Sequence, residues 1–176
     1  MAKSVILANG NIQVGLNQYG LVSDFFFPFV GSKNHVRGLT HKIGVWQNGE
    51  LSWLGSGEWT IDIDLCKDTF VGVMKCFHKK TSTELIINNV VYNEKNIFIR
   101  EVNVINHTEE IKNIKLFFHQ TFSVYDMPQV GTAYFDPIRN TIVHYEGKTV
   151  FTVSAEVNAV PFDDYTIGLF GVEGWE

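Results

Sequence analysis

Apolar and polar residues alternate in short runs along most of the chain, and turn-forming residues separate the runs. Residues 58–65 show the pattern most clearly, with Trp59, Ile61, Ile63 and Leu65 on one side and four polar residues on the other. A period of two places successive side chains on opposite faces of an extended strand. We therefore expect a half-buried antiparallel strand here, with its acidic side chains in solvent.

Two hairpins are predicted in the first third of the chain. The clearer one joins residues 43–46 to residues 51–54 through Asn48-Gly49, a dipeptide that readily adopts the positive φ angles of a type I′ turn. Residues 5–16 repeat the arrangement around the turn sequence Asn9-Gly10-Asn11. Both hairpins predict antiparallel pairing between neighbours in the chain.

Further extended segments follow, separated mostly by Asn, Gly, Lys or Glu, and no segment shows a convincing helical period. They are residues 21–23, 70–77, 84–92, 97–105, 111–124, 132–135, 141–145, 149–157 and 165–170. Strands this numerous and short favour an all-β fold, either an antiparallel two-sheet sandwich or a barrel. Asn89, Asn103 and Asn106, inside or at the ends of these strands, suggest bulges or sheet edges.

The composition fits one compact domain spanning residues 1–176, because 14% aromatic and 19% charged residues allow a large apolar core. The net charge is −5 and no basic cluster is longer than Lys79-Lys80, so neither nucleic acid nor an anionic membrane is expected as a partner. The sequence contains no apolar run of signal-peptide or membrane-span length. We therefore expect a cytoplasmic protein.

The cysteines and histidines give no pattern of a metal or cofactor site. Cys66 and Cys76 are expected to be reduced and buried, since two cysteines make no disulfide framework. No two of the six histidines stand at a close ligand spacing, and no phosphate-binding glycine loop or nucleophile motif is present. No cofactor and no metal are expected. The histidines are His35, His41, His78, His107, His119 and His144.

Paired carboxylates would indicate a glycosidase, because hydrolysis of a glycosidic bond uses two of them on either side of that bond. Three adjacent pairs occur, and they fall on the polar side of a strand or in turns, where acidic residues are normally solvated. They are Asp62 with Asp64, Glu109 with Glu110, and Asp163 with Asp164. No catalytic residue is predicted in this chain.

Aromatic side chains are the remaining candidates for ligand contact, because their faces stack on sugar rings. Trp46, Trp53, Trp59 and Tyr92 lie within strand patterns and are expected in the core.

Residues 24–35 differ from these strand patterns, because they combine four phenylalanines with a proline, a glycine and several polar tips and show no clear period. This stretch either plugs the end of the sandwich, with its polar residues capping turns, or contributes to a neighbouring site. Its candidate site residues are Asp24, Phe25, Phe26, Phe27, Pro28, Asn34 and His35.

Several of these segments, in order along nearly the whole chain, resemble a known family. The residues that carry the resemblance are residues 7–16, 20–28, 30–31, 34–35, 43–46, 48–49, 53–54, 98–100, 106, 131–136 and 142–145. They are similar to the N-terminal domain of prokaryotic glucoamylase-like enzymes of glycoside hydrolase family 15, which also includes glucodextranases and trehalases.

The resemblance implies an antiparallel supersandwich of the galactose mutarotase-like kind, packed against a helical (α/α)6 barrel. In the family that barrel hydrolyses α-glucosidic bonds with inversion, using one glutamate as acid and a second to activate water. The chain reaches residues 172–176 about where the family crosses to its barrel, so no catalytic residue is carried over. The implied partners are the catalytic barrel of the same polypeptide and its α-glucan or maltooligosaccharide substrate.

The resemblance also suggests a role for the aromatic stretch. We expect residues 25–35 to face the barrel, with the phenylalanines docking the two domains and Asp24, Asn34 or His35 bordering the substrate entrance. Two alternatives remain open. The chain is then either a stand-alone carbohydrate-binding module or the N-terminal domain of a glycoside phosphorylase with the same two-domain plan.

Overall fold

The computed structural model describes residues 4–123 and 131–168. Among these residues it contains β-strands and no helix, and so no helix that is long and apolar enough to cross a membrane. The strands pair antiparallel throughout, which confirms the predicted all-β, antiparallel fold. The chain divides into two compact units, unit 1 (Met1–Gln120) and unit 2 (Thr121–Glu176), and each is described by itself.

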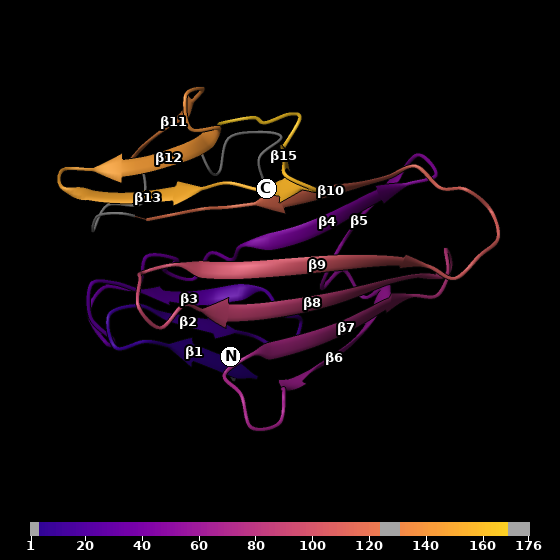
Figure 1. The fold of residues 1–176 in the computed structure, drawn as a ribbon, viewed down its shortest axis with the longest axis horizontal. Helices are drawn as coiled ribbons and strands as arrows, with labels where there is room; N and C mark the ends of the chain where they lie inside the picture. Colours follow the sequence, from indigo (N-terminus) through magenta and orange to yellow (C-terminus); the bar gives the residue numbers. More distant parts are fainter. Residues whose placement is uncertain (1–3, 124–130, 169–176) are drawn as a thin grey trace. The chain divides into compact units, whose positions relative to one another are not determined.

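Unit 1 begins with a three-stranded meander of β1 (Val5–Ala8), β2 (Gln13–Leu16) and β3 (Val22–Phe26), in that order (Figure 1). The predicted hairpin is confirmed, and the side chain of Asn9 shapes its turn by accepting backbone hydrogen bonds from the two residues after Gly10. The register between β2 and β3 shifts at Gly15, where Asp24 lies opposite. This shift is a β-bulge, which bends the strand just before the aromatic stretch.

A second sheet has the order β10-β4-β5 and contains β4 (Lys42–Gln47), β5 (Glu50–Trp53) and β10 (Ile114–His119). The second predicted hairpin is confirmed, with φ angles of 53° at Asn48 and 81° at Gly49 in its turn. Both angles are positive, as a type I′ turn requires.

A third sheet is the meander of β6 (Trp59–Leu65), β7 (Gly72–His78), β8 (Thr83–Val91) and β9 (Phe98–Asn106). The alternation predicted for β6 is confirmed, because Trp59 is buried and its acidic residues are exposed. The register between β8 and β9 is continuous, so the bulges suggested at three asparagines are wrong. The alternative of a sheet edge holds for Asn103 and Asn106, since β9 is an edge strand.

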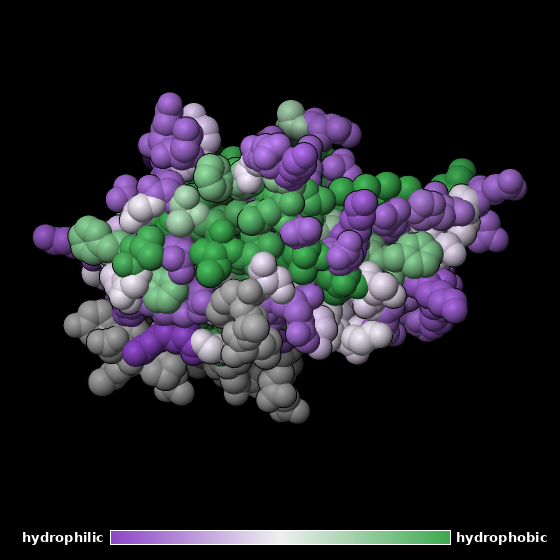
Figure 2. Space-filling model, turned by 90° about the horizontal axis from the view of Figure 1, so that it is seen from below, coloured by the Kyte–Doolittle hydropathy of each residue, from purple (hydrophilic) through white to green (hydrophobic). Residues whose placement is uncertain are grey.

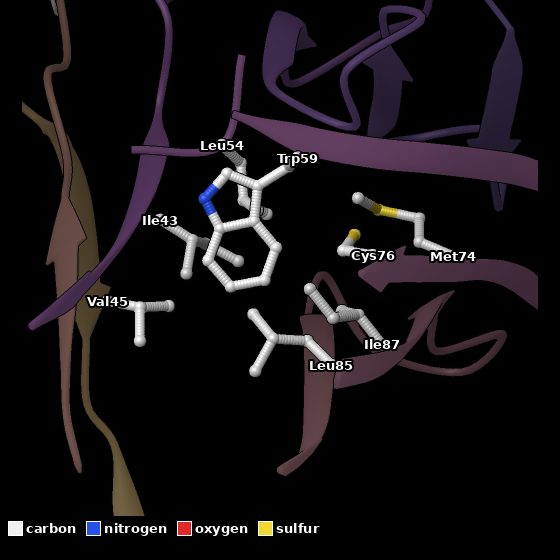
Figure 3. Close-up of a cluster of buried hydrophobic side chains, with 8 residues drawn as sticks. All are labelled: Ile43, Val45, Leu54, Trp59, Met74, Cys76, Leu85 and Ile87. Carbon is white, nitrogen blue, oxygen red and sulfur yellow. The ribbon is translucent and has the colours of Figure 1, made fainter. Parts of the chain in front are cut away.

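The second and third sheets of unit 1 face each other across a shared core (Figure 3). Ile43 and Val45 of β4 and Leu54, the residue after β5, form one side of this core. The other side comes from β6, β7 and β8. Packing two sheets through their inner faces defines a sandwich. The fully or nearly buried residues of the cluster are Ile43, Val45, Leu54, Trp59, Met74, Cys76, Leu85 and Ile87.

Unit 2 contains short antiparallel strands, β11 (Thr132–Asp136), β12 (Thr141–Glu146), β13 (Thr149–Val153), β14 (Glu156–Val157) and β15 (Val160–Pro161). Aromatic pairs hold it together, such as Phe122 stacked on Phe151 with ring centroids 4.7 Å apart. The strand predicted at residues 165–170 is wrong for residues 165–168, which are not in a strand. Its last two residues lie outside the described residues. Whether residues 1–176 form one domain, as the sequence predicts, stays a prediction.

The buried cluster predicts a large stability loss when one of its side chains is shortened. Leu85 is fully buried, so Leu85→Ala should lower the free energy of unfolding by about 2–5 kcal/mol, through lost apolar burial and the cavity left behind. Urea denaturation followed by circular dichroism measures the change. The control is Ile111→Ala, because Ile111 is fully exposed and should change stability by less than about 0.5 kcal/mol. Equal losses in the two variants would contradict the assigned core.

Candidate functional site

The aromatic stretch begins inside β3, which contains Asp24, Phe25 and Phe26. Phe25 is buried. The β-bulge between Val22 and Asp24 brings its side chain to the same face of β3 as the core residue Val22. Phe26 and Asn34 pair across an isolated bridge, so the segment between them forms a closed loop. The Phe27-Pro28 peptide bond in this loop is cis.

Asn34 organises this loop through its side-chain amide. Its Oδ1 atom accepts hydrogen bonds from the backbone N–H groups of Phe25 (3.0 Å) and Val36 (3.1 Å). Its Nδ2 atom donates to the Asp24 carboxylate at 2.7 Å. Asn34 and Asp24 are thus brought together, and their polar atoms bind the loop itself.

His35 lies in the interior of the loop, where only 3% of its surface is exposed. Its backbone N–H donates to the Phe25 carbonyl at 2.7 Å, and its Nε2 atom is 2.9 Å from the Phe27 carbonyl oxygen. A carbonyl accepts only, so Nε2 carries the ring proton and donates to it. The geometry therefore matches the interpretation in which these polar residues shape turns.

The loop exposes its tip and not its first phenylalanines. Phe29 is 66% exposed and Val30 is 45% exposed, whereas Phe26 and Phe27 are only partly exposed. Pro28 is also exposed and lies next to this tip. The docking role of the stretch stays a prediction, and the surface available for it is centred on Phe29.

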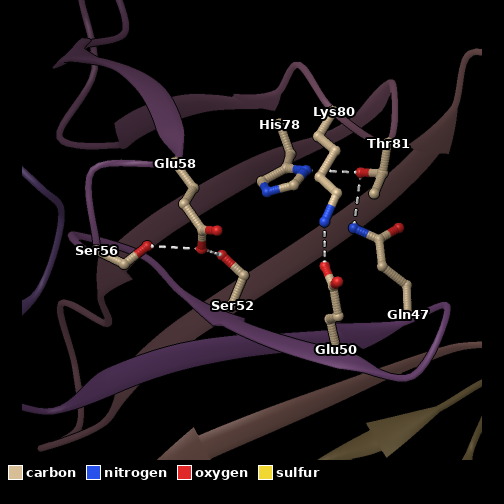
Figure 4. Close-up of polar contacts among 8 residues, drawn as sticks. All are labelled: Gln47, Glu50, Ser52, Ser56, Glu58, His78, Lys80 and Thr81. Carbon is tan, nitrogen blue, oxygen red and sulfur yellow. Dashed lines mark hydrogen bonds and ion pairs between the residues drawn. The ribbon is translucent and has the colours of Figure 1, made fainter.

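A second cluster of polar side chains lies in unit 1 and was not predicted from the sequence (Figure 4). It surrounds a depression of about 440 Å³ where the β4–β5 hairpin meets the connection between β7 and β8. A volume of this size suits a small ligand. The lining residues are Gln47, Glu50, Leu51, Ser52, Glu58, His78, Lys80 and Thr81.

One side of the depression is built on Ser52, an inner-face residue of β5. Its Oγ atom accepts a hydrogen bond from the indole N–H of Trp59 at 2.9 Å and donates to the carboxylate of Glu58. Ser56 donates to the same carboxylate oxygen at 3.1 Å. Hydrogen bonds from Ser52, and then from Ser56, lower the pKa of Glu58, so this carboxylate stays ionised at neutral pH.

A hydrogen-bonded chain of buried and partly buried polar residues forms the other side. Thr83 donates from Oγ1 to Gln47 Oε1 at 2.8 Å, and Gln47 Nε2 donates to Thr81 Oγ1 at 2.8 Å. Thr81 Oγ1 is also 2.8 Å from Nδ1 of His78. The His78 ring lies against Trp59, with centroids 4.9 Å apart. Lys80 and Glu50 form an exposed ion pair of 2.5 Å at the rim.

The sequence contains a signal for this cluster in the positions of its polar residues. Gln47, Ser52, His78 and Thr83 occupy strand positions whose neighbours on the same face are core residues. A polar residue at such a position must find a hydrogen-bond partner, since burying it alone is costly. Polar residues at several inner positions near the ends of neighbouring strands therefore indicate a shared polar site.

Of the four aromatic residues expected in the core, only Trp59 is buried there. The pairing register places Trp46 and Trp53 on the outer face of the β10-β4-β5 sheet, where both are partly exposed. The ring of Trp53 lies over Gly44, because a Cβ atom added at Gly44 would be 2.8 Å from it. Tyr92 is exposed as well, so the core prediction is wrong for these three.

Exposed apolar surface is extensive in unit 1. Seen from the side on which β6 and β7 lie in Figure 1, the molecule carries a broad apolar area (Figure 2). The exposed apolar residues of unit 1 include Leu65 at the end of β6 and Phe70 in the following loop, at 47% and 86%. A separate apolar depression of about 590 Å³ lies on the outer face of β7–β9 and includes Val73, Val90 and Ile99. Surfaces of this kind commonly contact another protein or domain.

The chain is similar to one curated protein, an uncharacterized glycosyl hydrolase of Methanocaldococcus jannaschii, with 24% identity over 151 residues. The aligned region covers 86% of this chain and 24% of the relative, so the chain spans about a quarter of that relative's length. No family profile and no solved structure matches the chain. The comparisons thus give a distant relationship to a glycosyl hydrolase, on an all-β antiparallel fold.

The hydrogen bonds of Asn34 predict that this residue stabilises the loop. Asn34→Ala leaves two backbone N–H groups without their acceptor, which should lower the free energy of unfolding by about 1–3 kcal/mol. Asn113→Ala is the control, because the side chain of Asn113 is exposed and makes no hydrogen bond with any residue in the described part of the chain. Thermal unfolding compares the two variants. A loss below about 0.5 kcal/mol for Asn34→Ala would contradict this role.

The two cysteines differ in their surroundings, which corrects the prediction that both are buried. Both are free, but Cys66 is exposed and Cys76 is buried. Burial raises the pKa of the Cys76 thiol to about 12. The folded thiol therefore ionises at higher pH than the unfolded one. Its burial stabilises the fold at neutral pH, and this contribution is lost as the pH rises from about 9 to about 12.

This difference predicts the number of reactive thiols. Only a thiolate reacts with Ellman's reagent, so at pH 8 we expect one thiol per native chain, Cys66, to react readily. In denaturant, two thiols should react. Cys66→Ser should abolish the fast reaction, and Cys76→Ser should leave it unchanged. Rapid reaction of two thiols in the native chain would contradict the burial of Cys76.

Proposed function

We propose that this chain is a non-catalytic β-sandwich domain of a glucoamylase-like glycoside hydrolase that acts on α-glucosidic bonds. In this proposal it docks to a helical catalytic barrel of the same polypeptide and shapes the rim of the active site. The observation that carries the proposal is the similarity to a glycosyl hydrolase along 86% of the chain but only 24% of the relative. Such an alignment suits one domain of a longer enzyme.

The surroundings of the adjacent carboxylates support a non-catalytic role. Asp62 and Asp64 are exposed on the outer face of β6, and the pairs at residues 109–110 and 163–164 are exposed outside the strands. An inverting glycosidase needs its two carboxyl groups on opposite sides of a bound sugar, with room for a water molecule. Pairs on an open surface do not enclose a substrate, so the proposal assigns the chemistry to the barrel.

The exposed apolar surface supports docking. Phe29 projects from the tip of the Asn34 loop, and its neighbour Val30 adds to the same exposed surface. Phe29 lies on a loop whose backbone is fixed by Asn34 and His35, so little ordering entropy is lost when a partner covers it. An apolar tip on a fixed loop suits the centre of a domain interface, where aromatic residues are enriched.

A stand-alone carbohydrate-binding module is a second candidate, and the outer face of the β10-β4-β5 sheet favours it. Trp46, Trp53 and Phe117 share this face, and the Nζ atom of Lys115 lies 5.5 Å from the centre of the Trp46 ring. Aromatic faces flanked by polar groups are suited to stacking on sugars. Binding of maltooligosaccharides by the isolated chain that is lost in Trp46→Ala would support this candidate.

The docking proposal predicts an effect that appears only in the complete polypeptide. Phe29→Ala should leave the stability of the isolated chain unchanged within about 0.5 kcal/mol, because the side chain is exposed. In the polypeptide translated from the complete gene, it should lower the free energy of unfolding by about 1–2 kcal/mol, as for an interface hot spot. Phe70→Ala is the matched control, since Phe70 is also exposed but lies in the β6–β7 loop.

Assays of the same polypeptides separate the catalytic alternatives. The complete polypeptide should release glucose from maltooligosaccharides, and the isolated chain should not. Release of glucose 1-phosphate that requires inorganic phosphate would show a phosphorylase instead. Docking would be contradicted if Phe29→Ala and Phe70→Ala had the same effect on the complete polypeptide.

A further inference from the structure

The depression beside Glu58 and His78 has a rigid polar floor. Gln47, Ser52 and His78 all line the depression, and each is more than nine-tenths buried. Gln47 and Ser52 are held by hydrogen bonds to Thr81 and Trp59, which belong to the opposite side of the sandwich, and His78 is held by Thr81 in the connection after its own strand. The groups at this site are therefore fixed in place before any ligand arrives.

The hydrogen-bonded chain accommodates a His78 ring that carries its proton on Nε2. Gln47 donates to Thr81 Oγ1, which leaves the hydroxyl proton of Thr81 available for Nδ1 of His78. When Nδ1 accepts this proton, a neutral imidazole carries its own proton on Nε2. In this tautomer the second nitrogen of His78 is a hydrogen-bond donor.

Glu58 supplies an acceptor opposite this donor. Its Oε2 atom receives the hydroxyl groups of Ser52 and Ser56, and its Oε1 atom binds no group of the residues that the structure describes. In Figure 4, this free oxygen and Nε2 of His78 are on the sides of the two residues that face each other. No direct bond joins them. A hydroxyl group between them would donate to Glu58 and accept from His78.

We propose that this depression binds a neutral sugar, with one hydroxyl group placed between Glu58 and His78. The rim adds a second acceptor, Glu50, and a second donor, Lys80, which suits the neighbouring hydroxyls of a pyranose. Among the lining residues, Glu50 and Glu58 are carboxylates and Lys80 carries an ammonium group, so the lining itself disfavours an anionic ligand. The ammonium group of Lys112 is held by the Thr81 carbonyl. The site is independent of docking through Phe29, and it gives the chain a sugar contact of its own.

Calorimetric titration of the isolated chain with maltotriose tests the proposal. We expect saturable binding at one site, and Glu58→Gln should weaken it about tenfold or more, because a hydrogen bond to a charged acceptor is lost. Glu101→Gln is the matched control, since Glu101 is an exposed glutamate on the outer face of β9 that also accepts a hydrogen bond, from Asn88. Glucose 1-phosphate should bind at least tenfold more weakly than maltotriose, because of its charge.

A spectroscopic measurement on the unaltered chain complements the titration. Resonances of the His78 ring nitrogens in the unaltered chain should shift on addition of maltotriose, which tests the site even if a variant fails to fold. The proposal would be overturned by absence of maltotriose binding, by equal affinity in Glu58→Gln, or by binding lost in Trp46→Ala and kept in Glu58→Gln. None of these results bears on the docking of Phe29, which is measured in the complete polypeptide.

Discussion

The side chain of Trp59 joins the parts of unit 1 on which both its stability and its polar site depend. Its ring belongs to the apolar cluster between the two facing sheets, while its indole N–H bonds Ser52 of the opposite sheet. A buried tryptophan requires such a partner, because its N–H would otherwise be left unpaired in an apolar environment. The hydroxyl of Ser52 then orients Glu58, so the core and the polar depression share one hydrogen-bonded path.

The polar cluster therefore has two roles that are physically inseparable. Gln47 crosses from the β4–β5 hairpin to Thr81 and Thr83 on the other sheet, which closes one end of the sandwich. The same bonds fix the ring of His78 at the depression. Fully satisfied networks of this kind make a structure specific, and partly satisfied ones are costly. The proposed sugar site thus uses groups that the sandwich already needs at this end.

The sequence predicted the strands well where local chemistry determines them. Asn48-Gly49 determines its own turn, and the alternation in residues 58–65 identifies which residues of β6 share a face. Alternation does not identify which face meets the other sheet when both carry apolar residues, and for that reason Trp46 and Trp53 were misplaced. Polar residues at inner strand positions indicate that a polar site exists, but which of them meet depends on contacts such as those of Gln47 with Thr81 and Thr83, which are distant in sequence. The loop of Asn34 was recognised as unusual, but its bonding required the three-dimensional structure.

The pairing of β10 with β4 has a consequence for how unit 1 assembles. The other neighbouring strands in its three sheets follow one another in the chain, whereas β10 pairs across all of β5 to β9. Closing a long loop costs chain entropy before any contact compensates for it. In the meander of β6 to β9, each strand pairs with the next one in the chain, so only short loops are closed. One face of this sheet carries buried apolar residues such as Met74, Leu85 and Ile87. The pairing of β10 with β4 is thus the least local strand contact in unit 1, and the second sheet is complete only when this contact is made.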